Sequence, residues 1–113
     1  MKKDIHFTGI SGSLRKGSFN SYLLNNLADL LPDGVVPEMI SFADLPLYNA
    51  DLDIPASKER PATVTAFRNK LLTTDGLIIV SPEYNYSIPG GLKNVIDWAS
   101  RGEDSPLLKN QYL

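Results

Sequence analysis

Hydrophobic and polar positions alternate along the chain in blocks that predict strands and helices in turn. A near-continuous apolar run over residues 5–10 is typical of a strand that is covered on both faces. Over 20–31, leucines recur at spacings of three and four, which predicts an amphipathic helix with Ser18 as its N-cap and Pro32-Asp33-Gly34 as its stop signal. The leucines of this stripe are Leu23, Leu24, Leu27, Leu30 and Leu31.

The middle of the chain carries a second strand and a long loop. Residues 35–42 alternate, which predicts a strand near a sheet edge, where Pro37 is tolerated. The apolar residues of one parity are Val36, Ile40 and Phe42. Residues 43–60 contain prolines with polar residues between them, which predicts an ordered surface loop with little regular structure.

A second helix and a third strand follow this loop. Pro61 suits helix position N1, and Thr74-Asp75-Gly76 is expected to end the helix. The apolar stripe of this helix consists of Val64, Phe67 and Leu71. The run 77–80 has no polar alternation, which is typical of a central parallel strand covered by helices on both sides.

The last predicted element is a third helix over 92–100, after a polar and aromatic loop at 81–91. Arg101 suits the negative end of this helix, and Gly102 is the candidate C′ residue. The residues expected to face inward are Leu92, Val95, Ile96 and Ala99.

This order of elements predicts an α/β fold with parallel strands joined by right-handed crossovers. A chain of 113 residues suits a single domain. If the strand order is 2-1-3, the carboxyl ends of the first and third strands lie side by side, where open parallel sheets bind ligands. We therefore expect the loops that follow these two strands to form the two walls of one cleft.

The first of these loops, GSLRKGSFN at 12–20, is rich in hydrogen-bond donors. A loop that enters a helix N-terminus offers unpaired backbone N–H groups, and Arg15 can hold a phosphate bidentately. The short polar side chains are Ser13, Ser18 and Asn20. The pattern favours a phosphate dianion, but matches neither the Walker nor the dinucleotide glycine spacing. The alternative is that Ser18 only caps the helix, while Gly12 and Gly17 make turns.

The second loop, PEYNYSIPGG at 82–91, combines flat apolar surface with donors. A planar polar heterocycle could stack on the tyrosines and bond to Asn85, Ser87 and backbone amides. Alternatively, one or both of Tyr84 and Tyr86 pack under the loop or at a subunit contact. Glu83 could be an acid of shifted pKa, or it could be solvated, salt-bridged or bonded to nearby amides.

Composition excludes several classes of function. Eleven Lys and Arg against thirteen Asp and Glu give a charge of −2, which argues against nucleic acid or an anionic membrane as partner. The absence of cysteine and the presence of a single histidine argue against a metal site. A chain without cysteine also suits the reducing cytoplasm. The first apolar run is too short for a signal peptide or a membrane span. His6 is expected to be a hydrogen-bonded sheet residue, and Trp98 to lie in the core or an interface.

Three segments together resemble the NAD(P)H-dependent FMN reductases of flavodoxin-like fold, in particular the soluble quinone and chromate reductases. They are GSLRKGSFN, DLPLYNADLD and SPEYNYSIPGGLKNVIDWASR, and the resemblance extends from about Ile5 to Pro106. It implies a three-layer α/β/α fold with a parallel sheet in the order 2-1-3. It also implies FMN as cofactor and NAD(P)H as co-substrate, with the chemistry carried by the flavin.

The same resemblance implies which residues hold FMN. The first loop would bind the phosphate, through Ser13, Leu14, Arg15, Lys16, Gly17, Ser18, Phe19 and Asn20. The second loop would line the isoalloxazine and ribityl side, through Pro82, Glu83, Tyr84 and Asn85. No side chain is implied as a catalytic residue or a metal ligand. The implied acceptors are quinones, azo compounds and metal oxyanions such as chromate. The implied assembly is a homodimer or homotetramer, with the third helix and Trp98 as a plausible contact.

The chain departs from the family pattern at its C-terminal side. The family continues into a fourth strand, a further flavin-contacting loop and a fifth strand, so we expect this chain to be an incomplete, C-terminally truncated domain with an apolar edge at 77–80. Three functions remain open on the sequence: an FMN-dependent oxidoreductase, a flavin-binding fragment without turnover, and a small module that binds phosphate ligands.

Overall fold

The protein is a parallel three-stranded sheet with helices on both faces. The computed structural model describes residues 4–53, 60–101 and 105–107. The strands are β1 (Ile5–Ser11), β2 (Val35–Met39) and β3 (Gly76–Val80). They are parallel and lie in the order β2-β1-β3, with Gly9 opposite both Met39 and Ile78. The predicted α/β class and strand order are confirmed.

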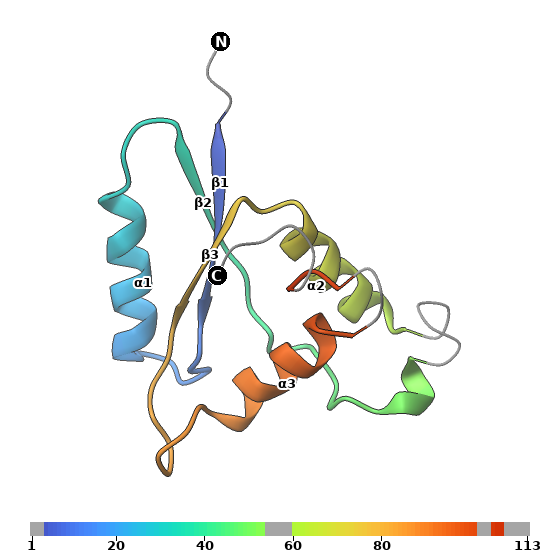
Figure 1. The fold of residues 1–113 in the computed structure, drawn as a ribbon. Helices are drawn as coiled ribbons and strands as arrows, with labels where there is room; N and C mark the ends of the chain where they lie inside the picture. Colours follow the sequence, from blue (N-terminus) through green and yellow to red (C-terminus); the bar gives the residue numbers. More distant parts are fainter. Residues whose placement is uncertain (1–3, 54–59, 102–104, 108–113) are drawn as a thin grey trace.

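The helices are α1 (Phe19–Asp29), α2 (Ala62–Leu72) and α3 (Gly90–Ala99), with a short 3₁₀ turn η1 (Ala50–Leu52). Figure 1 shows α1 on one side of the sheet, and α2 and α3 together on the other. The main core lies between the sheet and α2 and α3. Its members are Ile10, Ile40, Phe42, Phe67, Leu71, Leu92, Val95 and Ala99.

Prolines set two helix starts differently from the sequence prediction. Pro61 is the N-cap of α2 rather than its first helical residue, and Pro89 has the same role in α3. α3 therefore begins at Gly90, two residues earlier than predicted. A cap residue has extended backbone, and both prolines have ψ near 150° with the fixed φ of proline.

The predicted second strand is too long. β2 ends at Met39, although the Ile40 N–H still donates to the Gly9 carbonyl of β1 over 3.0 Å, and Ile40 and Phe42 are both buried in the main core. Val36 stays on the exposed edge strand, 38% exposed. The common parity of these residues does mark one face, because Glu38, between Val36 and Ile40, pairs with Lys70 of α2, and Ile40 and Phe42 pack in the core on that side.

Some apolar positions predicted to be inside are exposed. Ile79 of β3 is 41% exposed, and on α1 Leu23 and Leu30 are 52% and 78% exposed. No element in the described part of the chain covers these side chains. The prediction that helices cover both faces of 77–80 is wrong at Ile79, and the inner face of α1 is narrower than its leucine pattern indicates.

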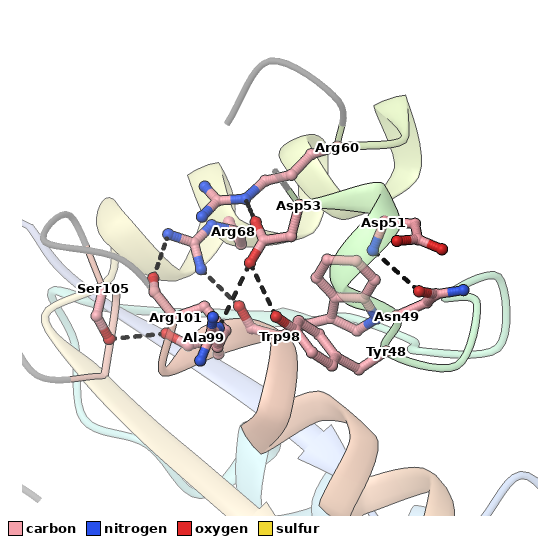
Figure 2. A network of polar contacts seen from close by, with 10 residues as sticks. All are labelled: Tyr48, Asn49, Asp51, Asp53, Arg60, Arg68, Trp98, Ala99, Arg101 and Ser105. Atoms are coloured by element: carbon pink, nitrogen blue, oxygen red, sulfur yellow. Dashed lines mark hydrogen bonds and ion pairs between the residues drawn. The ribbon is translucent and has the colours of Figure 1, made fainter. Parts of the chain in front are cut away.

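The loop after β2 is ordered by a buried carboxylate. Asp53 is 4% exposed and accepts from Arg60 Nε at 2.6 Å, Tyr48 Oη at 3.1 Å and Arg101 Nε at 3.4 Å (Figure 2). Burial acts to raise the pKa of Asp53, but the hydrogen bond and charge of Arg60, with the bonds from Tyr48 and Arg101, outweigh it and lower the pKa. The expectation of an ordered loop is confirmed for 43–53; residues 54–59 lie outside the described residues.

Trp98 is a core residue. Its side chain is fully buried, and its Nε1 donates to the Pro46 carbonyl over 2.8 Å. Its ring packs edge-on against that of Tyr48, with 4.8 Å between the ring centroids. Because no part of Trp98 reaches the surface of the single chain, the expectation that it contacts another subunit is wrong. Arg101 follows α3 and bonds to Asp53, whereas the predicted C′ residue Gly102 lies outside the described residues.

His6 is joined to the loop before β3 through its backbone. Its N–H donates to the Asp75 carboxylate over 2.9 Å, and its carbonyl accepts from the Asp75 N–H and the Thr74 hydroxyl. These bonds confirm His6 as a hydrogen-bonded sheet residue. Its side chain is exposed at the end of the sheet away from the two loops of interest.

Candidate functional site

The loops after β1 and β3 meet at the carboxyl end of the sheet. The Gly12 N–H donates to the Val80 carbonyl over 2.8 Å, and an ideal Cβ on Gly12 would lie 2.6 Å from Ser81 Oγ. A side chain at Gly12 would therefore force the loops apart. The two loops bound a cleft of about 310 Å³, lined by Gly12, Ser13, Leu14, Arg15, Phe42, Tyr84, Pro89, Gly90 and Gly91.

Serine hydroxyls hold the first loop in shape. Ser13 Oγ accepts from the Arg15 N–H, and Ser11 Oγ accepts from the Ser13 N–H, each at 3.3 Å. Ser21 of α1 donates to Ser11 Oγ over 2.9 Å, which ties the loop to the helix. Ser18 is buried and caps α1 by accepting from the Asn20 N–H, as predicted.

The first loop keeps donors that could bind an anion. Within the residues that the structure describes, the backbone N–H groups of Leu14, Lys16 and Gly17 donate to no protein acceptor. Gly17 has a φ of +74°, which a side chain would strain. The Arg15 guanidinium is exposed at the cleft and bonds weakly to the Gly17 carbonyl at 3.4 Å. Free amides beside a guanidinium are groups that can bind an anion.

The second loop contains a tight two-residue hairpin turn. Tyr84 and Ser87 exchange backbone hydrogen bonds of 2.9 and 3.1 Å, and Asn85 and Tyr86 have φ values of 52° and 66°. Two successive positive φ values identify a type I′ turn, which usually contains glycine because other residues are strained there. Local strain of this kind is common at ligand sites. The sequence indicates this turn only in part, because Asn85 tolerates a positive φ whereas Tyr86 stands where such turns usually have glycine.

The two tyrosines of this loop have different surroundings. Tyr84 is 51% exposed and lines the cleft, whereas Tyr86 is 97% exposed and lies outside the lining. The alternative that Tyr86 packs under the loop is therefore wrong. Glu83 is exposed and has no ion pair with any described residue, which agrees with the solvated alternative.

Four of the twelve predicted FMN-binding residues line the cleft: Ser13, Leu14, Arg15 and Tyr84. The others lie in the same two loops beside that lining: Lys16, Gly17, Ser18, Phe19, Asn20, Pro82, Glu83 and Asn85. Phe19 projects into solvent, at 82% exposed, and the Ser18 hydroxyl is occupied as a helix cap. The roles of all twelve toward FMN remain predictions.

Sequence reasoning placed the end of the second loop in this wall without assigning it to binding, and it missed Phe42, which packs against the loop's last glycine. Pro89, Gly90 and Gly91 line the cleft, and Pro89 has no side-chain donor or acceptor with which to cap α3. The first N–H groups of α3 therefore lie at the cleft without a cap. Phe42 packs against Gly91, where an ideal Cβ would lie 2.6 Å from Phe42 Cε2. The Pro-Gly-Gly sequence was a signal for the helix start, but nothing local placed Phe42 here.

The cleft brings together groups of two chemical kinds. It joins amide donors and a guanidinium on one wall to Tyr84 and a helix N-terminus on the other. Among the residues that the structure describes, no three His, Asp or Glu side chains are grouped to hold a metal ion. No helix in the described ranges is long and apolar enough to cross a bilayer.

Comparison with known proteins agrees with this arrangement. Residues 5–113 match the family model of NADPH-dependent FMN reductases. A quinone reductase of Escherichia coli K12 is 46% identical over 108 residues, which cover 95% of this chain and 56% of the relative. An NAD(P)H-dependent FMN reductase of Pseudomonas aeruginosa is 45% identical over 109 residues, which cover 94% of this chain and 56% of that relative. The chain thus spans just over half the length of these curated relatives.

The fold is shared with solved protein structures. The NAD(P)H:(acceptor) oxidoreductase FerB from Paracoccus denitrificans superposes with a TM-score of 0.82 at 33% identity, over 95% of this chain and 57% of that one. The azoreductase AzrA shares the fold with a TM-score of 0.65 at 18% identity, over 88% and 57%. The family match covers nearly the whole chain, and the fold agrees with it. The chain belongs to the NADPH-dependent FMN reductase family.

Proposed function

We propose that this protein binds FMN in the cleft between the loops after β1 and β3. In that complex it acts as an oxidoreductase that passes electrons from NAD(P)H to quinones, azo compounds or metal oxyanions such as chromate. The observation that carries the proposal is the cleft itself, because it joins an anion-binding loop to an aromatic wall at the carboxyl end of a parallel sheet. The names of the relatives support the same chemistry.

The residues present fit two parts of FMN. The phosphate suits the free N–H groups of Leu14, Lys16 and Gly17 and the guanidinium of Arg15, with Ser13 and Asn20 nearby. The planar ring suits the wall formed by Tyr84 and the start of α3, with Pro82, Glu83 and Asn85 at its side. When bound, FMN supplies the hydride chemistry. The protein binds and orients it, and no side chain is assigned as acid, base or nucleophile.

A second candidate function is flavin binding without turnover. The cleft volume of about 310 Å³ is at the lower end of small-molecule sites, so the described residues enclose FMN only in part. An incompletely enclosed flavin would still bind through its phosphate. It would not hold a nicotinamide in a defined place against the ring.

Titration of the purified chain with FMN separates these functions. Quenching of flavin fluorescence measures binding, and NADH- or NADPH-dependent reduction of benzoquinone, an azo dye and chromate measures turnover. Binding with turnover supports the oxidoreductase, and binding without turnover supports the second candidate. Absence of binding excludes both. Displacement of FMN by simple phosphate esters of equal affinity would favour a phosphate-binding module instead.

We further propose a homodimer or homotetramer in the cytoplasm that binds neither nucleic acid nor membrane. The large apolar surface of Phe19 and Tyr86, 82% and 97% exposed beside the cleft, supports contact with another subunit. The charge of −2 supports the absence of nucleic acid and membrane as partners, and the absence of cysteine supports the cytoplasm. Sedimentation of the FMN-loaded protein tests the assembly, and a monomer at all concentrations would contradict it.

A further inference from the structure

One amide side chain fastens the segment after β2 to α3. Asn94 Oδ1 accepts from the Tyr48 N–H over 2.8 Å, and Asn94 Nδ2 donates to the Pro46 carbonyl over 2.9 Å. Asn94 is only 8% exposed. Because the same side chain accepts from and donates to one stretch of backbone, it pairs with residues 46–48 much as a neighbouring strand would.

Trp98 adds a second attachment one turn further along α3. Its Nε1 donates to the same Pro46 carbonyl over 2.8 Å. Asn94 and Trp98 are four residues apart, so they lie on one face of the helix. Leu47, between the two attached residues, is 80% exposed, so backbone bonds rather than packing of Leu47 hold the segment.

The fastened segment begins at the wall of the cleft. Phe42 lines the cleft and packs against Gly91, in the first turn of α3. The Leu45 N–H donates to the Phe42 carbonyl over 3.1 Å, which closes a turn between Phe42 and Pro46. The place of the Phe42 ring against α3 therefore depends on how the next residues are held on that helix.

We propose that Asn94 is a positioning residue of the cleft. By holding 46–48 on α3, it sets the place of Phe42 against Gly91 and so the width of the cleft at the start of the helix. The identity of FMN as the ligand rests on the proposed function above. Aspartate at position 94 keeps the acceptor but loses the donor and places a charge against the Pro46 carbonyl, so it cannot replace the amide.

The test uses Asn94→Asp, with Asn69→Asp on the exposed face of α2 as the matched control. The chain has one tryptophan, so its indole N–H gives a single signal in an NMR spectrum. Hydrogen exchange of that group and of the Tyr48 amide, measured without FMN, reports on the attachment. Fluorescence titration reports on FMN affinity. We expect both exchange rates and the FMN Kd to rise about tenfold in Asn94→Asp, as for loss of a buried hydrogen bond, and to stay unchanged in the control.

A milder pair of variants tests the inference if Asn94→Asp does not fold. Leu47→Gly loosens the backbone between the two attachments, whereas Leu47→Ala removes the same exposed side chain without that freedom. Only the glycine variant is expected to weaken FMN binding. Its FMN Kd should rise about threefold, the size of effect expected from added backbone freedom.

The outcomes separate the inference from the proposed function. Faster exchange with an unchanged FMN Kd in Asn94→Asp would overturn the positioning role while the proposed function stands. Equal effects of Leu47→Gly and Leu47→Ala would overturn it too. If the unsubstituted protein binds no FMN, the proposed function fails and the inference fails with it.

Discussion

The Phe42 ring lies so close to Gly91 that an ideal Cβ on this glycine would be 2.6 Å from Phe42 Cε2. The neighbouring Gly90 has no such contact, since a Cβ there would meet nothing within 4 Å. The two glycines begin the same helix and line the same cleft. They therefore form a matched pair in which only one requires the absence of a side chain.

Alanine at these two positions should have opposite effects on stability. Gly91→Ala crowds a buried ring, so we expect a loss of about 1–2 kcal/mol and a melting temperature lower by about 3–8 °C. Gly90→Ala removes backbone freedom at no steric cost, so we expect a gain of up to about 0.5 kcal/mol. Thermal unfolding of both variants by circular dichroism measures the difference. Equal melting temperatures would show that Phe42 moves aside freely.

Arg15 should contribute charge to FMN binding. Because a hydrogen bond to a charged group is worth about 1.5–3 kcal/mol, we expect Arg15→Ala to raise the FMN Kd by about 10- to 100-fold. Arg15→Lys keeps the charge without the bidentate geometry, so its FMN Kd should lie between those of the unsubstituted protein and Arg15→Ala. The titration is repeated at low and high salt, where only the unsubstituted protein and the lysine variant should lose affinity steeply.

Lys70→Ala is the control for net charge, since Lys70 lies on α2 and pairs with Glu38 at 3.0 Å on the surface. It should leave the FMN Kd unchanged. An Arg15→Ala variant that binds FMN as tightly as Lys70→Ala would place the phosphate elsewhere.

Asp53 should make stability depend on pH in the acid range. Its pKa is lower in the folded protein than in the unfolded chain, so its contribution is complete above about pH 4 and is lost as the pH falls through the folded pKa. Asp53→Asn should cost about 1–3 kcal/mol at pH 7, because it removes the negative partner of Arg60 and Arg101. Thermal unfolding at pH 7, 5, 4 and 3 measures both effects.

The difference between the aspartate and asparagine proteins should shrink as the pH is lowered from about 5 toward 3. Asp33→Asn, at an exposed turn, is the control and should leave the pH profile unchanged. Parallel profiles of the unsubstituted protein and Asp53→Asn would contradict a lowered pKa at this carboxylate.

The backbone conformation of Tyr86 should lower the stability of the folded protein. Its φ of 66° is unfavourable for any residue with a Cβ, and its side chain is 97% exposed and contributes little burial. We expect Tyr86→Gly to raise the free energy of unfolding by about 0.5–1 kcal/mol. Denaturant titration measures this change. Tyr84→Gly, at a half-buried position of ordinary φ, should lower it instead, and a loss in both variants would argue against strain at Tyr86.

The succession of strands and helices, and the loops that carry the candidate site, follow from the amino-acid sequence alone. These features depend on residues close together in the chain: the apolar run of β1, the Ser18 cap and the glycines of the first loop. Parallel strands of such lengths have few possible orders, and the 2-1-3 order brings the first and third loops together. The resemblance carried by those loops then pointed to the family that the comparisons show.

The walls of the cleft and the contacts that hold them depend on residues far apart in the chain. Phe42 lines the cleft beside Gly91 of α3, and the buried Trp98 donates its indole N–H to the carbonyl of Pro46, 52 residues away. The Asp53 contacts with Tyr48, Arg60 and Arg101 likewise depend on where the loop crosses α3. Periodicity records which face of an element is apolar, but such contacts depend on the path of the whole chain, which no local pattern contains.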